Sequence, residues 1–141
     1  MKKEVKIKFP ANFDSVLGVR SLAQELALSA GFSDQESKRI YAVTDELCNN
    51  AIEHGSLSEE EVKVTFIVEK GKMMQIICED QGKGEEVSPA EQMQKVVGKK
   101  GGEKLSIRGR GLAKIVSSWV DELEFLDNEK GGLKVVATKY L

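Results

Sequence analysis

The chain has 141 residues, which suits a single domain and leaves little room for a second one. Its net charge of −2 gives no support for non-specific binding to nucleic acid or membranes, and its 40% of hydrophobic residues argues against global disorder. The N-terminus lacks the continuous apolar stretch of a signal peptide, and no later run approaches the ~20 apolar residues of a membrane span.

Apolar residues follow strand or helix periodicity along most of the chain. In chain order, the expected elements are a strand over 3–9, helices over 14–30 and 34–54, strands over 62–69 and 72–79, a helix over 111–119, and strands over 122–127 and 133–140. Consecutive hairpins imply a mostly antiparallel sheet with the helices gathered on one face. We therefore expect an α+β two-layer sandwich, with residues 1–141 forming one domain.

Capping residues mark the expected ends of the first two helices. Asn12 or Asp14 can cap the first helix, and Gly31 suits its C-terminal end. Ser33 followed three residues later by Glu36 fits a capping box at the start of the second helix. These residues agree with the helix boundaries that the apolar spacing predicts.

Cys48 and Cys78 are the two cysteines of the chain, and neither has a CxxC spacing or a histidine cluster beside it. This pattern favours reduced, packed thiols in a cytoplasmic protein. With a single histidine, His54, the sequence also gives no support for a zinc site.

The segment between Asp80 and Gly111 differs in composition from the rest of the chain. It is rich in glycine and charged residues and shows only a weak helical pattern, over 89–97. A stretch of this length inside a compact domain is typical of a functional lid or of a disordered segment.

Glu46 and Asn50 are the first candidate functional residues. They are four residues apart, so both project from one face of the expected second helix, beside its apolar stripe. An amide oxygen is a suitable ligand for Mg²⁺ that also binds phosphates and water, and a carboxylate one turn away can accept a proton from a hydroxyl group. The alternative is that both are solvated polar positions on an amphipathic helix.

Asp80, Gly82 and Gly84 follow an expected strand directly. An acceptor at a strand end can receive the amino group of adenine, and glycines without Cβ allow the backbone to approach a flat base. The alternative is an ordinary turn after a strand, in which Asp and Gly are common.

A second glycine motif stands just before the last expected helix. It consists of Arg108, Gly109, Arg110, Gly111 and Leu112. Exposed backbone N–H groups at a helix N-terminus favour an anion such as phosphate, and the arginines can add charge-assisted contacts. The alternative is a flexible loop with a glycine at the helix start, and the Walker motif is absent.

The three motifs together are more specific than any one of them. Their order, Glu-x₃-Asn on a helix, Asp-x-Gly-x-Gly after a strand and Gly-x-Gly-Leu before a helix, resembles the GHKL ATPase superfamily, whose nucleotide site is the Bergerat fold. The resemblance covers nearly the whole chain. Within the superfamily, the run Glu-Leu-Cys-Asn-Asn-Ala-Ile-Glu-His-Gly from Glu46 to Gly55 and the short length are similar to the anti-sigma-factor serine kinases.

The resemblance implies a role for each motif residue. Asn50 would be the Mg²⁺ ligand, Glu46 the base that activates a serine hydroxyl or water, and Asp80 the acceptor for adenine. Residues 85–108 would form the ATP lid. The other nucleotide contacts would come from Gly82, Gly84, Arg108, Gly109, Arg110, Gly111 and Leu112. The sequence departs from the family at Leu133, where members often have threonine after a glycine, so we transfer no nucleotide contact to that strand.

The resemblance therefore implies an ATP- and Mg²⁺-dependent serine/threonine protein kinase. Its partners would be a small anti-anti-sigma-type protein as substrate and a sigma factor or comparable regulator, and the family also suggests a homodimer. The alternative function is a nucleotide-gated protein-binding module without phosphoryl transfer. The presence of Glu46 favours the kinase, because a protein that only binds ATP has no need of a base.

Overall fold

The strands and helices follow the predicted order. A computed structural model describes residues 2–55, 60–81, 116–129 and 131–141. Its elements are β1 (Lys2–Pro10), a 3-10 turn (Phe13–Ser15), α1 (Val16–Ala30), α2 (Asp34–Asn50), a π-helical turn (Ala51–Gly55), β2 (Glu61–Glu69), β3 (Met73–Glu79), α5 (Ser117–Trp119), β4 (Glu122–Asp127) and β5 (Leu133–Tyr140).

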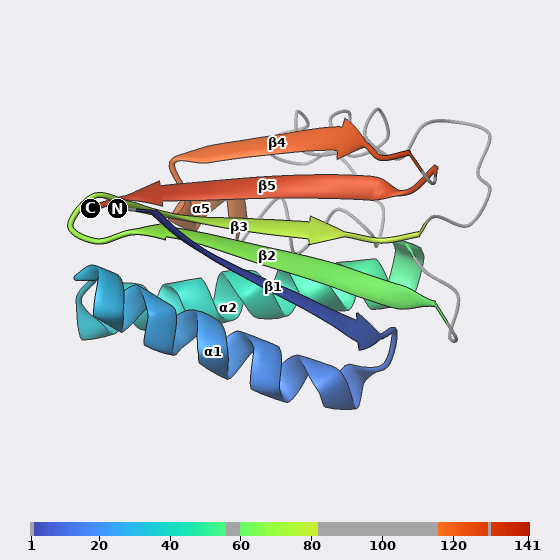
Figure 1. Cartoon of the computed structure of the whole chain (residues 1–141), viewed down its shortest axis with the longest axis horizontal. Coiled ribbons are helices and arrows are strands. Elements are labelled where there is room, and N and C mark those ends of the chain that lie inside the picture. The colour runs from blue at the N-terminus through green and yellow to red at the C-terminus, as the bar shows by residue number, and fades with distance from the viewer. Residues whose placement is uncertain (1, 56–59, 82–115, 130) are drawn as a thin grey trace, which may run out of the picture.

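The five strands form one antiparallel sheet in the order β1-β2-β3-β5-β4. Figure 1 shows α1 and α2 lying along the same side of this sheet. The predicted α+β two-layer sandwich is therefore confirmed. The central position of β3 agrees with its nearly continuous apolar run around Ile76, Ile77 and Cys78, because a central strand has neighbours on both edges.

The core lies between the helices and the sheet. Alternate residues of β2 are buried, namely Val62, Val64, Phe66 and Val68, as expected for a strand with one face toward helices. Helix α1 buries mostly small side chains, including Ala23, Ala27 and Ala30, so it can approach its neighbours closely. Helix α2 packs beside α1 and buries Ile40, Val43 and Leu47.

Asn12 caps the 3-10 turn before α1, and Ser33 caps α2 as predicted. Asn12 Oδ1 accepts a hydrogen bond from Ser15 N at 3.1 Å, and Ser33 Oγ accepts one from Glu36 N at 3.1 Å. Gly31 ends α1 with φ of 109°, a left-handed conformation that glycine adopts without steric cost.

The first two helices differ from the prediction at one end each. The expected helix over 14–30 begins with a 3-10 turn, and α1 itself starts at Val16. The expected helix over 34–54 divides at Asn50, after which Ala51–Gly55 form a π-helical turn. The 3-10 turn has 3 residues and the π-helical turn has 5, which is too short for apolar spacing to distinguish either from an α-helix.

Cys48 and Cys78 are free thiols buried in the core, as predicted. The hydrogen bond with Cys48 raises the pKa of the Cys78 thiol, and burial raises it further. A thiol in such surroundings is inert, so the pair serves packing. In the described part of the chain, no helix has both the length and the apolar character needed to span a membrane.

Candidate functional site

The C-terminal end of α2 and the end of β3 lie at the same end of the molecule. Cys78 Sγ donates a hydrogen bond to Leu47 O at 3.6 Å, which brings α2 against β3 two residues before Asp80. Asn50 follows Leu47 by about one helical turn. Figure 1 shows α2 and β3 ending on the same side, where the chain leaves each of them. The fold thus places Glu46 and Asn50, near the end of α2, at the same end of the molecule as Asp80.

Asn50 is a buried polar residue with an unusual feature. Its side chain is only 7% exposed, and within residues 2–55, 60–81, 116–129 and 131–141 its Oδ1 has no hydrogen-bond partner. Buried polar atoms almost always have a partner, so an exception needs an explanation such as an ion or a ligand. A neutral oxygen of this kind fits a Mg²⁺ ion whose other ligands are phosphate oxygens and water.

No group of three or more His, Cys, Asp or Glu side chains in the described part of the chain could hold a metal ion. Mg²⁺ does not require such a group, because it usually binds one or two protein oxygens together with substrate phosphates and water.

Glu46 lies one turn before Asn50 on the same face of α2 and is partly buried. Burial raises the pKa of its carboxyl group, and the nearby negative charges of Asp45 and Glu53 raise it further. A carboxylate whose charge is disfavoured binds a proton more readily. Glu46 therefore has the electrostatic character of a general base.

Arg20 of α1 offsets part of the negative charge beside Glu46. Its Nη1 donates to Asp45 Oδ1 at 2.6 Å, and its guanidinium lies 5.0 Å from the centre of the Tyr41 ring. The hydrogen bond to Asp45 is the main cause of the raised pKa of Arg20. The Arg20–Asp45 pair also links α1 to α2 next to the site.

Asp80 is held by the backbone at the start of β5. It is 2% exposed, and its Oδ1 accepts a hydrogen bond from Leu133 N at 2.9 Å. Its own N–H donates to Leu133 O at 3.1 Å. Leu133 makes both hydrogen bonds with its main chain, and its side chain is buried in the core.

Asn128 and Gly132 complete this arrangement and were missed as site residues. Asn128 Nδ2 donates to Asp80 O at 2.7 Å, and Asn128 Oδ1 accepts from Gly132 N at 2.8 Å. A Cβ atom on Gly132 would lie 2.2 Å from Asp80 O and 2.6 Å from Asp80 Oδ1. Only glycine fits this close approach. The signal in the sequence was the short segment between the strands expected over 122–127 and 133–140, to which no role was assigned.

The glycine motifs and the expected lid over 85–108 lie outside the described residues. This applies to seven predicted nucleotide contacts, namely Gly82, Gly84, Arg108, Gly109, Arg110, Gly111 and Leu112. Their roles stay predictions.

An amide and a carboxylate on one helix thus lie at the same end of the molecule as a fixed aspartate at a strand end. A comparison with protein-family models finds a match to the histidine kinase-like ATPase domain over residues 9–139. The chain belongs to this family, which is part of the GHKL superfamily.

Two solved structures show the same fold. The structure of the RsbU and RsbW domains of Rv1364c from Mycobacterium tuberculosis matches with a TM-score of 0.66 and 16% identity, over 97% of this chain and 32% of that chain. The structure of the SiaB-SiaC complex from Pseudomonas aeruginosa matches with a TM-score of 0.63 and 11% identity, over 97% of this chain and 89% of that chain. This chain thus spans about a third of the first of them. A search of curated protein sequences gave no match.

Proposed function

We propose that this protein is a cytoplasmic serine/threonine protein kinase that uses ATP and Mg²⁺ and acts as an anti-sigma factor or a similar partner-switching regulator. Its substrate would be a small anti-anti-sigma-type protein, and a sigma factor or comparable regulator would be its second partner. One observation carries the proposal: Asn50 Oδ1 is buried without a partner in the described part of the chain, one turn from Glu46 and at the same end as Asp80.

The comparisons support ATP as the ligand more strongly than they support a protein partner. Membership of the histidine kinase-like ATPase family supports ATP as the ligand. The titles of the two solved structures name an RsbW domain and a complex between SiaB and SiaC. Because the fold is shared at low identity, these titles support a protein partner only as a hypothesis for this chain.

Each described site residue has a distinct part in the proposed reaction. Asp80, fixed by Leu133 N–H, would accept the amino group of adenine and so place the nucleotide. Asn50 Oδ1 would hold Mg²⁺, which when bound neutralises charge on the phosphates during transfer. Glu46 would take the proton of the substrate hydroxyl group. The hydroxyl oxygen would then bond to the γ-phosphorus of ATP, while the bond between that phosphorus and the β,γ-bridging oxygen breaks.

The raised pKa of Glu46 suits this role. A base works best when its pKa approaches the operating pH, and burial together with Asp45 and Glu53 moves the pKa of Glu46 in that direction. Removal of a general base typically lowers a rate by about 10²–10⁴-fold. Glu46→Gln should therefore lose most of the transfer rate.

The first test separates nucleotide binding from catalysis. Calorimetry with Mg-ATP should show binding by the wild type and by Glu46→Gln, while Asp80→Asn should weaken it sharply. Asp80→Asn keeps an oxygen for Leu133 N–H, so a folding defect is not expected. The absence of measurable ATP binding by the wild type would remove the central claim.

The second test concerns phosphoryl transfer. The wild type and Glu46→Gln are incubated with Mg-ATP and an anti-anti-sigma-type protein of the same organism, and intact-mass analysis detects a phosphorylated product. The kinase proposal expects product with the wild type and almost none with Glu46→Gln. If partner affinity changes between ATP and ADP but no product forms, the nucleotide-gated binding module is correct instead.

A further inference from the structure

Asn128 uses both ends of its side-chain amide to join the turn between β4 and β5 to the end of β3. Its Nδ2 donates to Asp80 O at 2.7 Å, and its Oδ1 accepts from Gly132 N at 2.8 Å. A main-chain carbonyl can only accept and a main-chain N–H can only donate, so these two neighbours determine which end of the amide is the nitrogen. Figure 1 shows the turn and the end of β3 on the same side of the molecule. Asn128 therefore links two segments that lie far apart in the sequence.

The main chain of Asn128 also holds the peptide group that binds the Asp80 carboxylate. Asn128 N donates to Gly132 O at 3.0 Å. Gly132 O belongs to the same peptide group as Leu133 N, which donates to Asp80 Oδ1 at 2.9 Å. A hydrogen bond accepted by the carbonyl of a peptide group polarises that group and strengthens the bond that its N–H donates. Asn128 therefore both orients and polarises the donor that binds Asp80.

Asp80 itself lies just beyond the paired part of its strand. The register of β3 with β5 ends at Glu79 and Lys134. After that pair, Asp80 N donates to Leu133 O at 3.1 Å, and the carbonyl of Asp80 accepts from Asn128 Nδ2. The side chain of Asn128 thus replaces the ladder at the strand end and fixes the peptide plane that follows Asp80.

The orientation of Asp80 depends on this support because the residue is only 2% exposed. Hydrogen bonds weaken steeply when their geometry departs from linear, so a carboxylate recognises an amino group best when its direction is fixed beforehand. The bonds from Leu133 use its main chain, which nearly every residue type can supply. The bond from Asn128 needs a particular side chain. Position 128 is therefore a place where one substitution can alter Asp80 without touching it.

We propose that Asn128 is a positioning residue for nucleotide selection, which acts through Asp80 to make the site prefer a purine that carries the exocyclic amino group of adenine. The inference rests on the proposed function, in which Asp80 accepts that amino group. A hydrogen bond to a charged group contributes a factor of about ten or more to affinity. The wild type should therefore bind ATP at least about tenfold more tightly than purine riboside triphosphate, which has a hydrogen atom in place of the amino group.

The test is the ratio of the two affinities, measured by calorimetry with Mg²⁺ on the full chain. Asn128→Ala removes both side-chain hydrogen bonds, whereas Asn128→Asp keeps an acceptor for Gly132 N and replaces the donor to Asp80 O with an acceptor. Both variants should lower the ratio to about threefold or less. A residue that only shapes the turn would weaken both nucleotides equally and leave the ratio unchanged. Because Asn128→Asp keeps the bond within the turn, it decides the question if circular dichroism shows that Asn128→Ala is unfolded.

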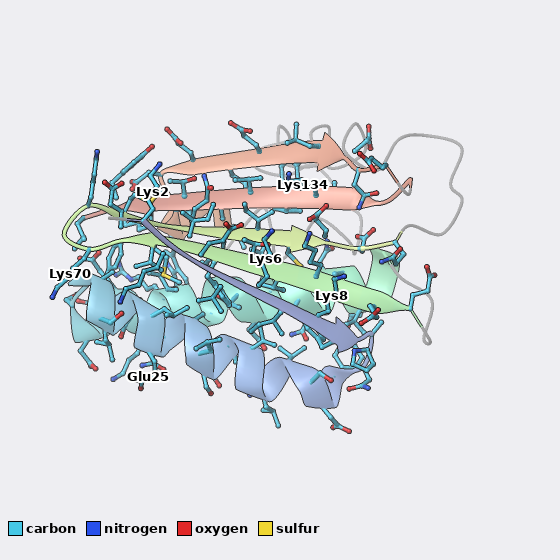
Figure 2. All side chains as sticks on the ribbon, viewed as in Figure 1. Lys2, Lys6, Lys8, Glu25, Lys70 and Lys134 are labelled. Atoms are coloured by element: carbon cyan, nitrogen blue, oxygen red, sulfur yellow. The ribbon has the colours of Figure 1, made fainter. Side chains whose placement is uncertain are left out.

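Lys134→Ala is the matched control. Lys134 follows Leu133 on β5 and pairs in register with Glu79, and Figure 2 shows it on the sheet. Its side chain belongs to the opposite face of the strand from the buried side chain of Leu133. The lost charge affects both nucleotides alike, because they carry the same phosphates. Lys134→Ala should therefore leave the ratio unchanged.

A double substitution tests whether Asn128 acts through Asp80. In an Asp80→Asn background, the addition of Asn128→Ala should weaken ATP binding much less than it does in the wild type, because the carboxylate through which Asn128 acts is gone. An equal loss in both backgrounds would reveal another route and overturn the inference. So would a ratio that both Asn128 variants leave unchanged, although ATP binding would then still stand. A wild type that binds neither nucleotide would overturn the proposed function, and this inference with it.

Discussion

Replacement of Gly132 by alanine should disrupt the connection between the end of β3 and the start of β5. The added Cβ would lie 2.2 Å from Asp80 O and 2.8 Å from Asp80 C, both of them main-chain atoms. Main-chain atoms cannot rotate away as the end of a side chain can, so the two segments must separate. The separation would strain or break the bonds from Leu133 N to Asp80 Oδ1 and from Asn128 Nδ2 to Asp80 O.

The size of the effect follows from two contributions. Overpacking in a tight site costs about 1–3 kcal/mol, and a lost hydrogen bond costs about 0.5–1.5 kcal/mol, or about 1.5–3 kcal/mol when one partner is charged. Gly132→Ala should therefore lower the free energy of unfolding by about 3–5 kcal/mol. It should also weaken Mg-ATP binding, because Asp80 loses the donor that fixes its carboxylate.

Gly131→Ala is the matched control. A Cβ at this position meets nothing within 4 Å, although φ is 79°. Only the left-handed backbone opposes alanine there, so the loss should be about 1–2 kcal/mol. Urea unfolding followed by circular dichroism measures both variants, and calorimetry measures nucleotide affinity. If Gly132→Ala is no less stable than Gly131→Ala, the close approach to Asp80 does not control this region.

Further variants test the other site residues and the first helix. Glu46→Gln should be at least as stable as the wild type in thermal unfolding at pH 7. The raised pKa of Glu46 means that its charged form opposes folding, and this penalty disappears only as pH falls. A clear loss of stability would contradict this expectation. Glu53→Gln should lower the pKa of Glu46 and move the acid limb of the transfer rate to lower pH, whereas an unchanged pH profile would show that the charge of Glu53 is not felt. Asn50→Ala should change stability by less than about 1 kcal/mol, because the Oδ1 atom of Asn50 has no partner in the described part of the chain. The same variant should need a higher Mg²⁺ concentration for ATP binding. A Mg²⁺ dependence equal to that of the wild type would refute the role of Asn50 as a ligand. Gly18→Ala should stabilise α1 by up to about 1 kcal/mol, since a Cβ there meets nothing within 4 Å, and lower stability would show a contact not accounted for.

Local patterns predicted most of the fold. Alternation gave the strands over 122–127 and 133–140 at their observed bounds, and the caps Asn12 and Ser33 were identified because they act within three residues of themselves. The spacing of four residues also placed Glu46 and Asn50 on one face of the expected second helix, because helical geometry alone determines which residues share a face.

The features that were missed depend on contacts between distant residues. The hydrogen bond from Asn128 to Asp80 joins positions 48 residues apart, and the sequence of the β4–β5 turn shows no sign of it. The strand register, which joins Lys6 to Glu124 across five strands, is equally non-local. Periodicity also cannot tell whether a buried amide such as Asn50 finds a partner, because that depends on the surrounding three-dimensional structure.

The attachment of Asp80 to the main chain of Leu133 has a consequence for how this site can change during evolution. Every residue except proline carries the N–H that Asp80 accepts, so the side chain at position 133 is free to follow the needs of the core. Leucine can then replace threonine there without releasing the aspartate. Position 132 has no such freedom, because any side chain would collide with Asp80. In this sequence Gly132, and not the residue after it, is therefore the position to inspect when related chains are searched for an aspartate held in the same way as Asp80.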